Sequence, residues 1–221
     1  MNADYYLKVI IPMLEALPTT LSITFFSFIL GLLLAVILAL IDHFKTPILS
    51  QIATVFVSFF RNTPQIPQLF LLYFGLPTLF PILKTASPYF ICIIALSFNA
   101  AAYMKEVIRG SILSVPQGQI EAALAHGVPH LKIMQSIVLP QAIRVALPSL
   151  FNNLVDVLKG SSIAFTIGVV EITAVAKLRA AVTFNYFETF MLLMLVYWGL
   201  IILLERISIR LERYLGKKYQ K

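Results

Sequence analysis

Charged residues are scarce in this chain of 221 residues: they make up 12% of it, whereas hydrophobic residues make up 59%. A typical soluble domain has about 25% charged and roughly 45–50% apolar residues. The deficit excludes an ordinary water-soluble domain, and it excludes intrinsic disorder because so much apolar surface must be buried. Cysteine is also nearly absent, since Cys92 is the only one. An internal disulfide and a cysteine metal cluster are therefore excluded.

Long uncharged runs predict where the chain crosses a lipid bilayer. A spanning helix needs about 20 mostly apolar residues, and residues 20–41 form such a run without any charge. We expect four further spans at about 50–75, 88–104, 147–176 and 187–204. The second of them is expected to be long and kinked at its two prolines, with two short interfacial segments as the alternative. The sequence thus predicts an all-α membrane protein with five transmembrane helices.

The distribution of lysine and arginine predicts the orientation. Most of them fall on one side of the membrane when the N-terminus is placed outside and the C-terminus inside, as the positive-inside rule requires. The net charge of +7 is then a topology signal, and no nucleic-acid partner is expected. The predicted parts are an external interfacial segment (1–18), a transmembrane domain (19–204) whose polar loop (about 105–144) joins spans three and four, and a basic cytoplasmic tail (205–221).

The polar loop carries seven residues at characteristic spacing. They are Glu121, Ala122, Ala123, Gly127, Ile137, Leu139 and Pro140. Good helix formers precede Gly127, which can end a helix in a left-handed conformation, and Pro129 prevents its simple continuation. We expect a second short helix from about 130 to 138 that stops near Pro140. The pattern predicts a compact pair of short helices on the inner side, suited to being gripped by a soluble partner.

This spacing, EAA-x3-G-x9-I-x-LP, resembles the cytoplasmic signature of bacterial ABC-importer permeases at every fixed position. The stretches 60–64 (FRNTP) and 139–142 (LPQA) are similar to the polar-amino-acid branch of that family. The resemblance implies a permease in the bacterial inner membrane, surrounded by membrane lipids. It implies three kinds of protein partner: a dimer of ATPase subunits, an identical or homologous permease, and a periplasmic or lipid-anchored amino-acid-binding protein. The seven-residue segment would couple the permease to the ATPase.

The chain itself lacks the means to hydrolyse ATP. Its only Gly-Lys pair is Gly216-Lys217, and the glycine that a phosphate-binding loop needs five positions earlier is Leu211. We expect no catalytic residue and no cofactor on this chain, with ATP and Mg²⁺ on the partner ATPase. No metal site is expected either, because a glycine and a proline interrupt the helix between His126 and His130.

Polar residues inside the predicted spans are candidates for the substrate pathway, because such groups are costly in lipid. The candidates are Asn99, Asp156, Lys159, Ser161 and Ser162. Lys159 is expected to meet a substrate carboxylate, and it can pair with Asp156 at i, i+3; a structural pair that holds helices together is the alternative. In the family that the chain resembles, this stretch typically reads Lys-Asp-Thr-Ser-Leu. Here Gly160 stands in place of the carboxylate, which removes an obvious partner for a substrate ammonium. The alternative is that Asp156 compensates from one turn earlier.

Four more residues are expected to gate or support the pathway: Arg61, Pro64, Tyr103 and Glu171. Arg61 is expected to pair with Glu171 across the bundle or to reach the outer headgroups, and Glu171 is either a gate or a solvated residue. Tyr103 is expected to pack between helices, with a place in the lining of the pathway as the alternative.

The leading interpretation is the permease subunit of an ATP-driven importer of a polar amino acid or a derivative. The alternatives are a secondary transporter with its own ion coupling and an idle membrane scaffold. A secondary transporter usually has inverted repeats, and this sequence shows no evident repeat.

Overall fold

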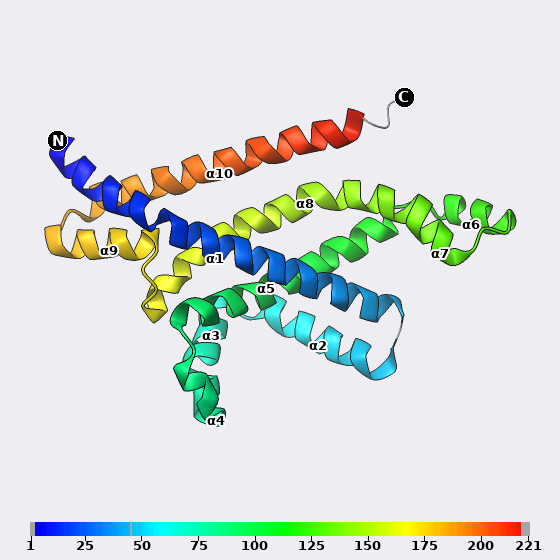
Figure 1. Ribbon diagram of the computed structural model, residues 1–221, viewed down its shortest axis with the longest axis horizontal. Coiled ribbons are helices and arrows are strands. Elements are labelled where there is room, and N and C mark those ends of the chain that lie inside the picture. Colours follow the sequence, from blue (N-terminus) through cyan, green and yellow to red (C-terminus); the bar gives the residue numbers. More distant parts are fainter. Residues whose placement is uncertain (1–2, 45, 218–221) are drawn as a thin grey trace.

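The protein is described by a computed structural model that covers residues 3–44 and 46–217, and these residues are mostly helical. Four long helices run broadly along the longest axis of the molecule (Figure 1): α1 (Ala3–His43), α5 (Pro88–Leu113), α8 (Leu139–Gly160) and α10 (Tyr186–Lys217). The start of α1 lies at one end of this bundle together with α9 (Ile172–Thr183). The short helices α6 (Gln117–Ala125) and α7 (His130–Ile133) lie at the opposite end.

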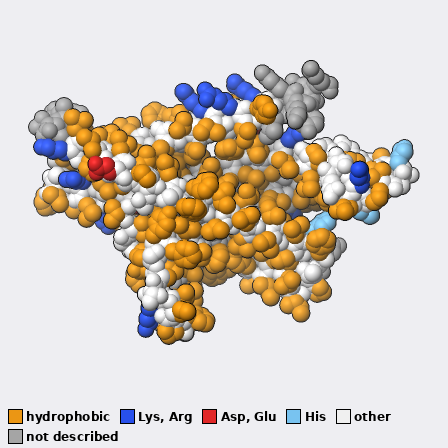
Figure 2. All heavy atoms as spheres, in the orientation of Figure 1, with side chains coloured by type: hydrophobic (Ala, Val, Ile, Leu, Met, Phe, Trp, Pro, Cys, Tyr) orange, Lys and Arg blue, Asp and Glu red, His pale blue; other side chains and the backbone are white. Residues whose placement is uncertain are grey.

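Four stretches of the described residues are long and apolar enough to cross a membrane: Tyr5–His43, Pro88–Leu113, His130–Ile167 and Tyr186–Tyr214. Hydrophobic side chains cover most of the face shown in Figure 2. Both observations indicate a multi-pass membrane protein. The predicted count of five spans and the predicted orientation are not confirmed.

The second predicted span is divided by a break in the backbone. α2 (Pro47–Asn62) ends at Thr63, whose extended conformation leads into α3 (Gln65–Phe70). Neither helix is long enough to be counted as a span by itself. The chain then leaves the bundle (Figure 1) through the π-helical turn η1 (Leu71–Gly75), α4 (Leu76–Leu79) and the 3₁₀ turn η2 (Pro81–Thr85).

The N-terminal segment 1–18 does not form a helix of its own. In its described part, α1 continues without interruption through Pro12 and Pro18. Val9 and Met13 are buried in a cluster with apolar residues of α9 and α10. Burial of this face favours one continuous helix, because most helical stability in proteins comes from packing rather than propensity. The expected boundary near residue 18 is therefore absent from the secondary structure.

α1 and α5 are packed closely along much of their length. A Cβ atom at Gly31 would lie 3.1 Å from Ala100 Cβ and 3.1 Å from the Ser97 carbonyl oxygen. Such close approach through small residues is how helices associate in lipid, where apolar burial gives no advantage over contact with acyl chains. At the C-terminal end of α1, Asp42 forms an ion pair with the Lys105 ammonium of α5. The two helices are thus joined by close packing and by charge.

The predicted polar loop, 105–144, includes the ends of two long helices. α5 continues to Leu113, and α8 begins at Leu139. Pro140 does not stop the helix, because the backbone is helical before it and continues through it into α8. A π-helical turn, η3 (Met134–Val138), connects α7 to α8.

The fourth predicted span, 147–176, is wrong at both of its ends. α8 starts earlier than predicted, at Leu139, and ends at Gly160. The 3₁₀ helix η4 (Ser161–Ile167) follows it. Gly168 then adopts φ +86°, a left-handed conformation that glycine reaches at little cost. The chain turns there and enters α9 as a separate helix.

Candidate functional site

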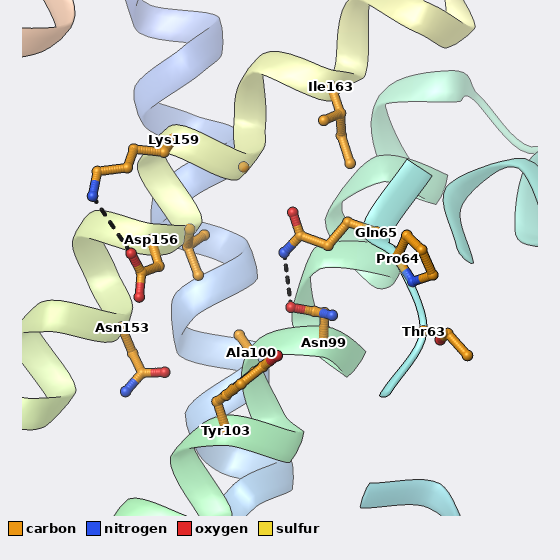
Figure 3. Close-up of a pocket in the computed structure, with 12 residues that line it drawn as sticks. Thr63, Pro64, Gln65, Asn99, Ala100, Tyr103, Asn153, Asp156, Lys159 and Ile163 are labelled. Atoms are coloured by element: carbon orange, nitrogen blue, oxygen red, sulfur yellow. Dashed lines mark hydrogen bonds and ion pairs between the residues drawn. The ribbon is translucent and has the colours of Figure 1, made fainter. Parts of the chain in front are cut away.

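A cavity of about 590 Å³ lies where the break between α2 and α3 faces α5 and α8 (Figure 3). Its lining combines amides, hydroxyls and one pair of opposite charges with a few apolar groups. The lining residues are Thr63, Pro64, Gln65, Asn99, Ala100, Tyr103, Asn153, Asp156, Val157, Lys159, Gly160 and Ile163. Three of the predicted pathway residues, Asn99, Asp156 and Lys159, are therefore brought together at one site.

The break itself is held by a side-chain amide. In an uninterrupted helix, the carbonyls of Phe60 and Thr63 would accept from the N–H groups of residues 64 and 67, and both of these residues are prolines. Gln68 Nε2 supplies the missing donors instead, at 3.0 Å from the Phe60 oxygen and 2.9 Å from the Thr63 oxygen. Buried carbonyls must find a donor, and here a buried glutamine provides it.

Asn99 connects α5 to this break. Its Nδ2 donates to the Phe60 carbonyl at 3.0 Å and to Gln68 Oε1 at 3.1 Å. Its Oδ1 accepts from Gln65 Nε2 at 2.7 Å. The predicted pathway residue Asn99 does line the cavity, but its polar atoms are already engaged with the protein. Gln65 and Gln68 were missed from the sequence, although two glutamines next to two prolines inside an apolar run are a signal that could have found them.

Lys159 and Asp156 form the charged wall of the cavity (Figure 3). Lys159 Nζ lies 3.6 Å from Asp156 Oδ1, as their spacing predicted, and the side chains are 57% and 72% exposed. Both residues belong to α8, so this pair joins no two helices of the chain. The alternative of a structural pair that holds helices together is therefore wrong for the contacts within this chain.

The two serines after Gly160 do not line the cavity. The Ser161 hydroxyl is buried and donates to the Leu158 carbonyl at 2.7 Å. The Ser162 hydroxyl donates to the Lys159 carbonyl at 2.7 Å. Both hydroxyls therefore bond to the backbone of their own segment, and their expected contact with a substrate stays a prediction without geometric support.

Arg61 and Tyr103 meet beside the break. The Arg61 guanidinium lies 5.6 Å from the centroid of the Tyr103 ring, and the Tyr103 hydroxyl donates to the Arg61 carbonyl at 3.3 Å. Tyr103 is 42% exposed and lines the cavity, which favours the alternative expectation, a place in the lining, over packing between helices. Pro64 lines the same cavity.

Glu171 is neither solvated nor paired with Arg61, and its expected role as a gate stays a prediction. It is fully buried rather than solvated, and it makes no ion pair with Arg61. Its carboxylate caps α9 by accepting from the backbone N–H groups of Thr173 at 2.9 Å and Ala174 at 2.8 Å. Burial raises the pKa of this carboxyl above its usual range, although its hydrogen bonds act in the opposite direction. Glutamate at the start of a helix also interacts favourably with the helix dipole.

The segment that carries the seven spaced residues, 121–140, lies at the end of the bundle opposite the start of α1. No residue of α6 is buried, and Glu121 and Ala122 are exposed. Gly127 has φ +74°, and Pro129 precedes the first residue of α7, so the predicted turn is confirmed. The remaining motif residues lie between this surface and the bundle: Ala123 and Ile137 pack against a buried cluster, Pro140 is half-buried, and Leu139 is 39% exposed.

The exposed unit is tied to the helices that line the cavity. Its buried cluster consists of Val115, Ile133, Val138 and Ala142, which come from both sides of the turn. Gln141 Nε2 of α8 donates to Gln119 Oε1 of α6 at 2.7 Å. Since α5 leads into α6 and α8 follows α7, the exposed unit is connected directly to two helices that line the cavity.

These features define the class of protein: a multi-pass membrane protein with a polar cavity between its helices and an exposed helical segment at one end of the bundle. Residues 28–217 match the family model described as "Binding-protein-dependent transport system inner membrane component". The chain belongs to this family, the permeases of ABC transporters.

Similar proteins point to amino-acid transporters. The chain is 42% identical over 216 residues to the "Probable amino-acid ABC transporter permease protein PatM" of Vibrio harveyi, covering 98% of this chain and 97% of that protein. It is 39% identical to the arginine transport system permease protein ArtQ of Bacillus subtilis, covering 91% of each. A crystal structure of an amino acid ABC transporter with histidines has a TM-score of 0.89 at 30% identity, covering 97% of this chain and 100% of that chain.

A more distant structure supports the fold alone. The methionine ABC transporter MetNI, in an inward-facing conformation, gives a TM-score of 0.79 at 20% identity, covering 97% of this chain and 99% of that chain.

Proposed function

We propose that this chain is the permease subunit of a bacterial ATP-driven importer and forms the pathway for a polar amino acid or a derivative. The observation that carries the proposal is the polar cavity, whose walls α5 and α8 continue to the exposed segment α6–α7. The cavity offers a cation, an anion and several amides, which are the groups that an amino-acid backbone requires. The names of the amino-acid permeases to which the chain is similar support this substrate class.

The energy source is a separate ATPase dimer, which holds ATP and Mg²⁺. Most of α6 is exposed, and Ile120 and Ala123 attach it to the buried cluster, so it can dock as a rigid body. Closure of the ATPase on ATP would displace α6 and, through α5 and α8, bias the equilibrium between inward-open and outward-open forms. The remaining partners are an identical or homologous permease and an external amino-acid-binding protein.

The proposed topology places α6 and α7 in the cytoplasm. The start of α1 and α9 then face the outside, and the described end of α10 lies toward the cytoplasmic side (Figure 1). In this arrangement α2 and α3 together make a broken crossing, and the protein lies in the inner membrane.

Reconstituted uptake tests the proposal. Proteoliposomes containing the permease are supplied with the ATPase, the external binding protein and labelled amino acids. We expect accumulation only when ATP and both partners are present. Accumulation driven by an ion gradient in the absence of the ATPase would contradict the proposal and indicate a secondary transporter, and no accumulation under any condition would indicate a scaffold.

A matched pair of variants tests the cavity itself. Lys159→Met removes the only cation among the lining residues, and we expect it to abolish uptake while the complex still assembles. Lys84→Met is the control, because Lys84 is an exposed residue of η2 outside the cavity. Equal uptake by the two variants would exclude the cavity from the pathway.

A further inference from the structure

The orientation of the Gln65 amide follows from its partners. The Phe60 carbonyl can only accept, so the atom of Asn99 that contacts it at 3.0 Å must be Nδ2. Asn99 Oδ1 is then the acceptor for Gln65, and the group of Gln65 that lies 2.7 Å from it must be Nε2. The opposite atom of the amide, Gln65 Oε1, is therefore turned away from Asn99 (Figure 3). No hydrogen bond to this oxygen is formed by the residues that the structure describes.

Gln65 Oε1 lies over Gly160 on the opposite wall. A Cβ atom at position 160 would lie 3.3 Å from Gln65 Oε1 and 3.3 Å from Leu96 Cδ2. Contacts this short would force the neighbouring side chain to move. Because Gly160 has no side chain, the Gln65 oxygen can occupy this space. The two positions are complementary: the absence of a side chain on α8 permits a neutral acceptor to reach in from α3.

The charges of the lining residues sum to zero. Lys159 and Asp156 are the only charged residues among those that line the cavity, and they face each other at 3.6 Å. A further charge lies beside the lining residue Tyr103: the Arg61 guanidinium, which is positive. A solute with a net positive charge would therefore enter a cavity whose one carboxylate, Asp156, is already paired with Lys159, and the occupied cavity would carry a net positive charge.

We propose that Gln65 and Gly160 form a specificity-determining pair that selects amino acids with no net charge. Gln65 Oε1 accepts a hydrogen bond from the substrate ammonium, and Lys159 meets the carboxylate. Asp156 stays within ion-pair distance of Lys159, so a cationic side chain would leave the occupied cavity with a net positive charge. The inference rests on the proposed function, since it assigns the substrate class of the same cavity.

Direct binding to the permease–ATPase complex, without the binding protein, tests the pair. The probes are labelled glutamine, serine and methionine as uncharged side chains, and arginine and lysine as cationic ones. We expect the wild-type complex to bind at least one uncharged probe about tenfold more tightly than either cation. Gly160→Asp adds a carboxylate next to Gln65 and should raise arginine binding relative to glutamine by about tenfold.

The control variant adds the same charge elsewhere in the cavity. Asn153 lines the cavity from α8, with its Nδ2 bonded to the Ser149 carbonyl. Asn153→Asp should raise arginine binding relative to glutamine binding by less than Gly160→Asp does. Gln65→Leu removes the acceptor without adding charge, and it should weaken binding of the uncharged probes. It keeps the proposal testable if Gly160→Asp does not fold.

Four results would overturn the pair. One is a wild-type complex that binds arginine or lysine as well as the uncharged probes, another is an equal switch in Gly160→Asp and Asn153→Asp, and the third is unchanged binding in Gln65→Leu. A complete assembly that imports amino acids while the complex binds none of the probes would also overturn it. Failure of ATP-dependent uptake by the complete assembly would instead refute the proposed function, so the two failures are distinguishable.

Discussion

Gln68→Met tests whether a side-chain amide holds the break between α2 and α3. The change keeps the length of the side chain but leaves the Thr63 carbonyl without the donor at 2.9 Å. The Phe60 carbonyl retains Asn99 as a donor, so one carbonyl is orphaned rather than two. An unsatisfied buried group costs about 1–3 kcal/mol. We therefore expect the free energy of unfolding to fall by about 1–3 kcal/mol.

Equilibrium unfolding of the purified permease measures this change, with uptake in proteoliposomes as the second readout. Gln51→Met is the matched control, because Gln51 is an exposed glutamine of α2. Exposed substitutions of this kind usually shift stability by less than about 0.5 kcal/mol. If the two variants unfold alike, the break does not depend on Gln68, and the assignment of Gln68 as the replacement donor is refuted.

Three further predictions concern the supports around the cavity. Gly127→Val should weaken attachment of the ATPase, seen by co-purification, because φ +74° is strained for a β-branched residue; unchanged attachment would show that the turn tolerates the strain. Lys105→Met should destabilise the permease in equilibrium unfolding, and adding Asp42→Asn should restore part of the loss, since the two residues form an ion pair; additive effects would refute this coupling. Glu171→Ala removes the cap of α9 and should cost about 1 kcal/mol of unfolding free energy, whereas a cost near zero would mean that the cap is dispensable.

The sequence was sufficient to predict the helical class, the exposed unit and part of the cavity. Composition and hydropathy identified an all-α membrane protein, because an apolar run of about 20 residues has few other solutions. The turn at Gly127 followed from local backbone preferences. The convergence of Asp156 and Lys159 followed from helical spacing, since residues three apart are neighbours on a helix surface.

The errors in the predicted helix boundaries came partly from contacts between segments that are distant in the sequence. Hydropathy does not report that Val9 and Met13 pack against α9 and α10, so the continuity of α1 was missed. Pro140 was expected to stop a helix, but the helical backbone continues through it from η3 into α8. The cap role of Glu171 depends on where α9 begins, which periodicity alone does not determine.

At Gly31 the backbones of α1 and α5 are close enough that an added methyl group would touch both Ala100 and Ser97. Sliding one helix past the other would bring a larger side chain into a space that admits only hydrogen. The contact at Gly31 therefore opposes sliding of α1 along α5. The backbone departs from a helix at Thr63 instead, where glutamine and asparagine side chains replace the missing main-chain donors.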